Sequence, residues 1–279
     1  MSGRGTSPDF VEALARGLDV LTCFGRDRPT LSLAEVAADT GLARPTARRL
    51  LVTLQELGYV RAVGGSYALT PRVLRLGMAY ASSLGLWDIA RPHLADLVAV
   101  TRESSSMAQL DGSDIVYVAR VAVPKIITLR VAIGTRFPAL QTSQGKVLLA
   151  ALQPAELTAA LAEPSRSGLP PFLPRERSAV DAELMAVRAR GWAVADEELA
   201  PGIRSVAVPV RDGTGAVRAA MNVTVHAAET SVETLTRTHL PHLLRTAGEV
   251  SAEWALWQAR PYDEFGQLSA SRPREVAHA

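Results

Sequence analysis

The stretch between residues 32 and 69 restricts the possible folds more than any other part of the chain. Ser32 is followed three residues later by Glu35, which is the pattern of a capping box at the start of a helix. Thr40 and Gly41 then indicate a turn, because glycine adopts a positive φ without steric cost. A second helical pattern and a glycine-rich hairpin follow at once. The sequence therefore predicts helix, turn, helix and hairpin in that order.

The second of these helices has two different faces. Pro45 suits its first position, and Gly58 is expected to end it. One stripe is apolar and is expected to be buried, and it consists of Ala47, Leu50, Leu51, Leu54 and Leu57. Beyond the helix, residues 59–62 and 66–69 are typical of two strands joined by a tight turn at residues 63–65.

The opposite face of the same helix is basic. Between Gly41 and Arg75 the chain has six arginines and one acidic residue, Glu56, although its net charge is only +2. A GC-rich genome would raise the arginine content everywhere and does not explain this cluster. A helix fits the major groove of B-DNA, where arginine side chains match guanine edges and phosphates. A basic, solvated helix in an ordinary helical subdomain is the alternative.

We therefore predict that this segment binds double-stranded DNA. The candidate contacts are Arg44, Pro45, Thr46, Arg48 and Arg49 in the helix, and Arg61, Ser66 and Tyr67 in the hairpin. Within this set, Arg48 and Arg49 are expected to reach the groove, while the hairpin residues are expected to contact the DNA backbone.

Length and composition exclude several classes of protein. The chain has 279 residues, which suits two domains, and 48% hydrophobic residues, which is ample for packed cores. Its apolar runs are shorter than the roughly 18–20 residues that span a bilayer, and its start lacks the apolar core of a signal peptide. A single cysteine, Cys23, excludes an internal disulfide and disfavours a thiolate zinc site. We expect a cytoplasmic protein without a membrane partner, metal or cofactor.

The pattern as a whole predicts an α+β protein with four parts. These are a winged helix-turn-helix at 1–70, a linker helix at 71–85, an α/β domain at 86–259 and a loose tail at 260–279. A first helix is expected to start at Ser7 and Pro8. In the α/β domain, helices are predicted at 88–101, after Ser143 and over 231–259 with a bend at Pro241, and strands at 115–119, 126–133 and 216–226.

One strand of the second domain has a polar face. Asn222, Thr224 and His226 alternate with three apolar residues, so the two sets point to opposite faces of a sheet. The helix that begins near Ser143 offers free backbone N–H groups and the positive end of a helix dipole, which suit a carboxylate. Together these features are typical of a pocket for a small acid. A solvated sheet face is the alternative for Asn222 and Thr224.

On these motifs the sequence resembles the IclR family of transcription regulators over roughly residues 10–257. The matching segments are 10–24, 31–60, 69–72, 134–138, 142–146, 196–198 and 206–209. The resemblance implies a winged helix-turn-helix, a GAF/PAS-like effector-binding domain, a DNA operator as partner, and homodimers that often pair into homotetramers. Residues 103–106, 111–120 and 131–136 more finely resemble the Pca/Pob-type regulators of aromatic acid breakdown by the β-ketoadipate pathway.

The same resemblance implies the effector contacts, which are Ser143, Gln144, Asp196, Ser205, Asn222 and Thr224. Ser205 stands where some members have cysteine, and Asn222 and Thr224 where some have serine, so the shape of the pocket is expected to differ. The implied ligand is an aromatic or dicarboxylic acid such as protocatechuate, 4-hydroxybenzoate or β-ketoadipate. Arg130 and Arg136 are two further candidates for pairing with its carboxylate.

Three other interpretations remain open at this point. Ser143 and Lys146 fit the S-x-x-K signature of serine acylases, although the companion motifs are missing from the sequence. His239 and His242 are spaced for a metal, but a clear third ligand is lacking. The third possibility is a DNA-binding protein whose large domain only oligomerises. We expect a ligand-controlled regulator and not an enzyme.

Overall fold

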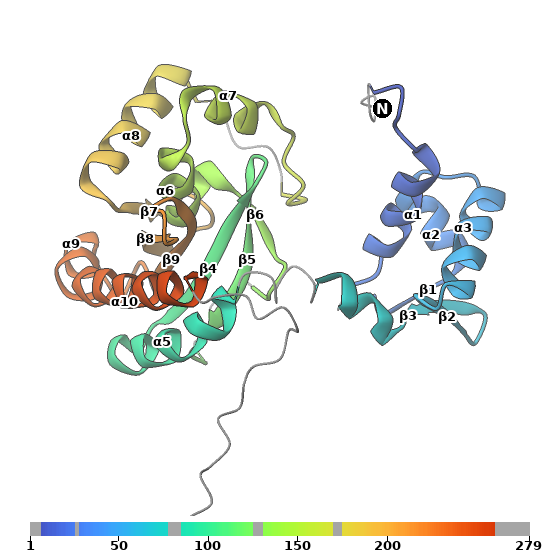
Figure 1. Cartoon of the computed structure of the whole chain (residues 1–279), viewed down its shortest axis with the longest axis horizontal. Coiled ribbons are helices and arrows are strands. Elements are labelled where there is room, and N and C mark those ends of the chain that lie inside the picture. The colour runs from blue at the N-terminus through green and yellow to red at the C-terminus, as the bar shows by residue number, and fades with distance from the viewer. Residues whose placement is uncertain (1–6, 26–27, 78–84, 125–130, 170–174, 260–279) are drawn as a thin grey trace, which may run out of the picture. The chain divides into compact units, whose positions relative to one another are not determined.

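The structure is a computed structural model of the whole chain, and it describes residues 7–25, 28–77, 85–124, 131–169 and 175–259. Contacts divide the chain into two units, Met1–Leu84 and Gly85–Ala279, which are described one at a time (Figure 1). The predicted tail at 260–279 and residues 78–84 of the predicted linker helix lie outside the described residues. None of the helices in the described ranges is long and apolar enough to cross a membrane.

The N-terminal unit contains three helices and a three-stranded antiparallel sheet. Its elements are α1 (Glu12–Thr22), β1 (Thr30–Leu31), α2 (Leu33–Thr40), α3 (Arg44–Glu56), β2 (Val60–Val63) and β3 (Ser66–Leu69), with the strand order β1-β3-β2. The predicted winged helix-turn-helix is therefore confirmed. Strand β1 was not predicted, because two residues are too short to display an alternating pattern.

Local chemistry explains the boundaries of these elements. The Ser32 side chain accepts the N–H of Glu35, and the Glu35 carboxylate accepts the N–H of Ser32, which completes the predicted capping box. Gly41 ends α2 at a φ of 66°. Gly64 and Gly65, at φ values of 54° and 81°, form a two-residue hairpin turn. Thr70 then caps a short 3-10 helix, η1 (Pro71–Val73).

Two expectations about this unit were wrong. Leu57 was predicted to be buried, but it is 52% exposed because α3 ends at Glu56 and Leu57 lies beyond its last turn. The first helix begins at Glu12 and not at Ser7, because the Ser7 side chain instead accepts the N–H of Asp9 in a turn.

The C-terminal unit is built on a six-stranded antiparallel sheet with the order β6-β5-β4-β9-β8-β7. The strands are β4 (Ser104–Asp111), β5 (Asp114–Val121), β6 (Arg136–Pro138), β7 (Ala193–Asp196), β8 (Ile203–Arg211) and β9 (Val217–His226). A strand was predicted at 126–133. Residues 131–133 are not in a strand, and residues 126–130 lie outside the described ones.

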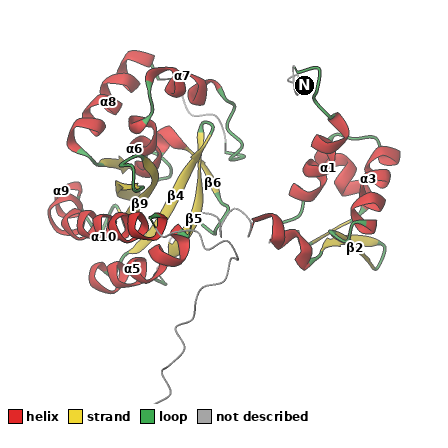
Figure 2. Ribbon diagram, viewed as in Figure 1, coloured by secondary structure: helices red, strands yellow, loops and turns green. Residues whose placement is uncertain are grey.

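Helices cover both faces of this sheet (Figure 2). One face is covered by α5 (Leu86–Thr101) and by α10 (Leu240–Gln258), which follows α9 (Val232–Thr234) and the π-helical segment η3 (Leu235–His239). The other face packs against α6 (Ser143–Ala151), which follows the 3-10 helix η2 (Ala139–Gln141). Helix α8 (Arg177–Arg190) packs on α6, and α7 (Pro154–Ala162) contributes to the same hydrophobic core. The mixed helix and strand class is confirmed.

The bend predicted at Pro241 corresponds to a π-helical segment just before it. Proline has no N–H for the carbonyl one turn earlier, and its ring crowds that carbonyl. The five residues of η3, Leu235–His239, are accordingly π-helical and end just before α10 begins at Leu240.

Helix α6 is buried on nearly all sides. Eight of its nine residues are buried, and Ala151 is the exception. This burial depends on Gly145, because a Cβ atom at that position would lie 2.1 Å from the carbonyl oxygen of Ala139 in η2. The close approach of backbone to backbone sets the N-terminal end of α6 against η2.

We predict that Gly145→Ala destabilises the C-terminal unit by about 2 kcal/mol or more, because the methyl group meets backbone that cannot move cheaply. Gly248→Ala in α10 is the matched control. Its Cβ would meet no atom within 4 Å, so helix propensity alone should raise stability by up to about 1 kcal/mol. Urea unfolding followed by tryptophan fluorescence reports on this unit, because all four tryptophans lie in it. Equal stability of the two variants would contradict the prediction.

Candidate functional site

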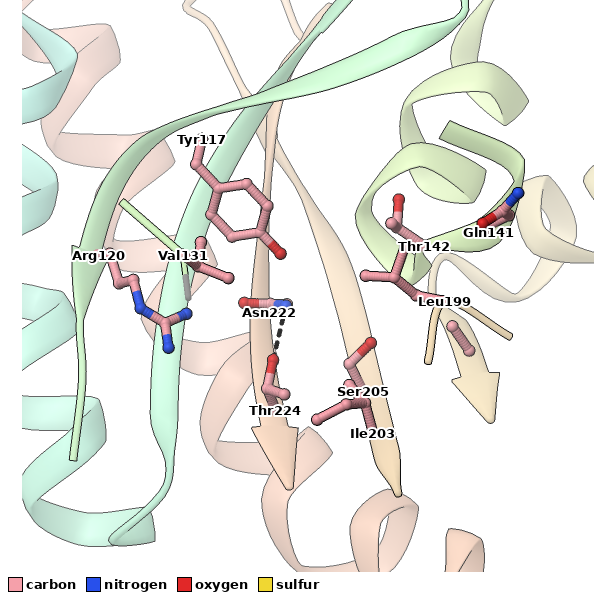
Figure 3. Close-up of a pocket in the computed structure, with 11 residues that line it drawn as sticks. Tyr117, Arg120, Val131, Gln141, Thr142, Leu199, Ile203, Ser205, Asn222 and Thr224 are labelled. Carbon is pink, nitrogen blue, oxygen red and sulfur yellow. Dashed lines mark hydrogen bonds between the residues drawn. The ribbon is translucent and has the colours of Figure 1, made fainter. Parts of the chain in front are cut away.

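A small cavity lies where the N-terminal end of α6 meets the sheet (Figure 3). It is lined by Tyr117, Arg120, Val131, Gln141, Thr142, Ala195, Leu199, Ile203, Ser205, Asn222 and Thr224. Its volume is about 30 Å³, the size of a few water molecules at most. A larger ligand can therefore enter only if lining side chains move.

Strand β5 contributes Tyr117 and Arg120, which sequence reasoning missed as site residues. In a regular strand, residues three apart point to opposite faces. Here Tyr117 pairs with Ala108, whereas the next pair joins Ala119 to Met107, so Val118 is an extra, bulged residue. The bulge turns Arg120 to the same face as Tyr117. Strict alternation gave no signal of this, although a single arginine in an apolar strand was a hint.

Arg120 supplies positive charge to the cavity. Its guanidinium donates to Ser106 Oγ over 3.0 Å, and it is the one charged side chain among the described lining residues. Burial lowers the pKa of Arg120, and the neighbouring Tyr117 acts in the opposite direction. Arginine nonetheless stays protonated in proteins, since its ordinary pKa lies above 12. The cavity therefore contains a fixed cation at neutral pH.

The Tyr117 hydroxyl remains a neutral donor and acceptor. Burial raises the pKa of this phenol to about 12, although Arg120 and a hydrogen bond with Asn222 favour the ionised form. Figure 3 shows the Tyr117 hydroxyl and the Arg120 guanidinium on one side of the opening, with Thr142 across from them. A planar acid would meet both a cation and a phenol there.

Three of the six predicted effector residues line the cavity, namely Ser205, Asn222 and Thr224. Asn222 Oδ1 accepts the N–H of Ser106 over 3.1 Å, and Asn222 Nδ2 donates to Thr224 Oγ1 over 3.0 Å (Figure 3). Antiparallel pairing places Ser205 directly beside Thr224. The polar face predicted for this strand therefore looks into the molecule.

Ser143 and Gln144 are buried behind this lining. Ser143 Oγ lies 2.7 Å from Ser205 Oγ, which joins α6 to β8. Gln144 Nε2 donates to the carbonyl oxygens of Ser106 and Ala220. The residue of this segment that does line the cavity is Thr142, whose hydroxyl caps α6 by accepting the N–H of Gly145.

The remaining candidates point elsewhere. Asp196 is exposed and pairs with Arg204 over 2.6 Å, so its carboxylate does not line the cavity. Arg136 pairs with Asp111 and with the buried Asp114, away from the cavity lining. Arg130 lies outside the described residues.

The residues that suggested an enzyme or a metal site are bonded to other side chains. The Lys146 ammonium is bound by Glu183 and Glu198, while Ser143 pairs with Ser205. His242 Nδ1 lies 2.8 Å from an Arg245 nitrogen. Groups of three or more histidines, cysteines or carboxylates that could hold a metal do not occur within the described ranges.

A second candidate site is the outer face of α3. Arg44, Pro45, Arg48 and Arg49 are exposed, and Thr46 is half-buried. In the hairpin, Arg61 is exposed, whereas Ser66 and Tyr67 are half-buried and Tyr67 packs against the core of the unit. Within the described part of the chain, Arg44, Arg48, Arg49 and Arg61 have no carboxylate partner. The face therefore offers unpaired guanidinium groups to an external anion.

The start of α3 adds to this positive face. Its N-cap is Ala43, whose side chain cannot accept a hydrogen bond from the first turn. Pro45 has no N–H and the Thr46 N–H donates to the Ala43 carbonyl, so the Arg44 N–H is the one backbone donor of that turn that the described structure leaves for an anion. The helix dipole also favours negative charge there.

The N-terminal unit also has an apolar groove, of about 860 Å³, between α1 and α3. Its apolar lining includes Leu14, Leu18, Leu21, Leu50, Leu57, Tyr59 and Leu76. Several of these side chains are more than half exposed, among them Leu14 and Leu18. A continuous apolar surface of this kind marks an interaction site.

Comparison with protein families gives a match to each unit. The family described as "IclR helix-turn-helix domain" matches residues 13–64. The family described as "Bacterial transcriptional regulator IclR C-terminal" matches residues 78–252.

Individual proteins are similar over most of the chain. The "Pca regulon regulatory protein" of Pseudomonas putida is 38% identical over 244 residues, which are 87% of this chain and 84% of the relative. The crystal structure of a transcriptional regulator from Rhodococcus is 46% identical, with a TM-score of 0.74, and covers 89% of this chain and 100% of its own. The inducer-binding domain of a PobR double mutant from Acinetobacter, in complex with 3-hydroxybenzoic acid, is 29% identical, with a TM-score of 0.53; the match covers 59% of this chain and 96% of that one.

Proposed function

The chain belongs to the IclR family of bacterial transcription regulators, and from that premise we propose that it is a cytoplasmic homodimer or homotetramer whose binding to a palindromic operator responds to a small aromatic or dicarboxylic acid. The family consists of regulators and not of enzymes. In keeping with this, the Lys146 ammonium is bound by carboxylates and does not contact the Ser143 hydroxyl, as the S-x-x-K interpretation would need. The observation that carries the ligand part of the proposal is the half-buried Arg120 in the cavity lining.

The proposed DNA contacts follow from the outer face of α3. Arg48 and Arg49 would enter the major groove, where a guanidinium can pair with guanine O6 and N7. The Arg44 side chain and its backbone N–H would hold a phosphate, and Arg61, Ser66 and Tyr67 would contact the DNA backbone from the hairpin. The lack of carboxylate partners supports these roles, because each arginine can bind DNA without first breaking an ion pair.

The proposed dimer follows from the apolar groove. Leaving Leu14 and Leu18 in water costs free energy that a second copy of this surface would recover. A dimer with twofold symmetry would present two α3 helices, which is what a palindromic operator requires.

The proposed effector site is the cavity at the end of α6. Arg120 would pair with the carboxylate of the effector, and Tyr117, Asn222, Thr224 and Ser205 would supply further hydrogen bonds. The PobR domain binds 3-hydroxybenzoic acid, and the relative from Pseudomonas regulates the Pca regulon. These two similarities favour hydroxybenzoates as the ligand class, with 4-hydroxybenzoate and protocatechuate as the first compounds to test.

We expect Arg49→Ala to weaken operator binding by about 1–3 kcal/mol, because one bidentate base contact is lost. The operator is first selected from random duplexes with the wild-type protein, and affinity is then measured by gel shift at fixed salt. Arg237→Ala is the matched control, since Arg237 is an exposed arginine of the other unit that pairs with Glu233. An affinity loss of the same size in both variants would mean that only net charge matters.

For the dimer, Leu18→Glu should raise the dimer dissociation constant by at least about tenfold, because a carboxylate would be buried in an apolar interface. Sedimentation velocity over a concentration series measures this change. Met185→Glu is the control, since Met185 is an apolar side chain of α8 that is at least as exposed as Leu18. A dimer unaffected by Leu18→Glu would move the interface away from the groove.

For the effector site, Arg120→Met should weaken binding of 4-hydroxybenzoate by about 10- to 100-fold, the equivalent of one charge-assisted hydrogen bond pair. Isothermal titration calorimetry measures the affinity, and 4-hydroxybenzamide, which lacks the carboxylate, should be insensitive to the substitution. Arg136→Met is the control, because Asp114 keeps its hydrogen bonds from Ser165 and Arg166. If wild-type protein binds the acid and Arg120→Met binds it equally well, the assignment of Arg120 is wrong.

A further inference from the structure

Lys146 is a fully buried ammonium just behind the cavity. The residue is 1% exposed. Its backbone N–H donates to the carbonyl oxygen of Thr142, so Lys146 lies one helical turn after a residue that lines the cavity. Its Nζ atom lies 2.8 Å from Glu183 Oε1, contacts Glu198 Oε1 still more closely, and donates to the Val194 carbonyl over 3.3 Å. A buried ammonium is stable only with such partners.

The two carboxylates belong to different parts of the fold. Glu183 lies in α8 and is also bound by Arg175 over 2.8 Å. Burial tends to raise the pKa of Glu183, but the hydrogen bonds from Lys146 and Arg175 outweigh burial and hold that pKa below its usual range. Glu198 instead lies in the turn between β7 and β8, next to Leu199, which lines the cavity.

The turn that contains Leu199 is closed by its own hydrogen bonds. Glu197 adopts a positive φ of 58°, its carboxylate accepts the N–H of Gly202 over 2.8 Å, and its own N–H donates to the Ile203 carbonyl. These bonds make the turn a compact unit. The contact between Glu198 and Lys146 joins that unit to α6.

We propose that Lys146 and Glu198 are a positioning pair, which holds Leu199 against the α6 end of the cavity and sets how readily the cavity opens to its effector. This inference rests on the proposed function, because it takes the cavity to be the effector site. A cavity that holds only a few waters must open before a hydroxybenzoate enters. The far end of the Leu199 turn is bonded to the segment after β9 through the Gly202 carbonyl and the Ala227 N–H, and the Lys146–Glu198 ion pair is what joins the Leu199 side of the turn to α6. Neither member of the pair would touch the ligand.

The test compares removal of each carboxylate from the same ammonium. Glu198→Gln should speed hydrogen–deuterium exchange of the backbone at residues 196–203 by about tenfold in the ligand-free protein, because the turn loses its tie to α6. Glu183→Gln removes an equal charge from Lys146 but leaves that tie in place, so exchange in the same segment should remain at the wild-type rate. Glu198→Asp, which keeps the charge, should restore slow exchange in large part.

A second measurement concerns the ligand. In stopped-flow experiments with 4-hydroxybenzoate, Glu198→Gln should raise the association and dissociation rates together, since a looser wall opens more often in both states. Equal acceleration of exchange in Glu198→Gln and Glu183→Gln would overturn the proposal, because the pair would then only neutralise a buried charge. Unchanged exchange in Glu198→Gln would overturn it as well. If wild-type protein fails to bind the acid, the proposed ligand class fails, while the exchange comparison still decides the role of the pair.

Discussion

The C-terminal unit depends on the contact between Gly145 and the carbonyl of Ala139. Because that position has no side chain, α6 can be buried almost entirely and its first turn can reach the sheet. Ser143 then meets Ser205, and Gln144 bonds to the backbones of two central strands. A methyl group there would meet the backbone of Ala139 and push the start of α6 away from η2, which would displace the cavity-lining Gln141 and Thr142 that connect the two.

Most polar groups around the cavity form hydrogen bonds with one another. Asn222 bonds to the backbone of Ser106 and to Thr224, and Arg120 bonds to the hydroxyl of Ser106. Such a network holds a cation in place before any ligand arrives, so an incoming carboxylate need not order it. The small volume of the cavity adds a requirement for opening, and in our proposal the Lys146–Glu198 pair sets how readily the Leu199 turn allows it.

The N-terminal unit follows the opposite principle. Its arginines on α3 have no carboxylate partners in the described structure, and its groove between α1 and α3 leaves leucines exposed. Unpaired cations on one surface and exposed apolar side chains on another both lower the stability of such a unit when it is free in water. Both surfaces suit partners outside the chain, one anionic and one apolar, in line with the operator DNA and the second copy of the chain that we propose.

Features that local backbone chemistry controls could be predicted from the amino-acid sequence. The capping box at Ser32, the turn at Gly41, the Gly64-Gly65 hairpin and the polar face of β9 all depend on neighbours within a few residues. The positions of Arg120 and Asp196 depend on contacts between distant parts of the chain, and only the folded structure shows them. The bulge at Val118 brought Arg120 into the cavity, and Asp196 turned away to pair with Arg204. A bulge and an ion pair are selected by the strands and charges that pack around them, and a single strand read in isolation contains neither.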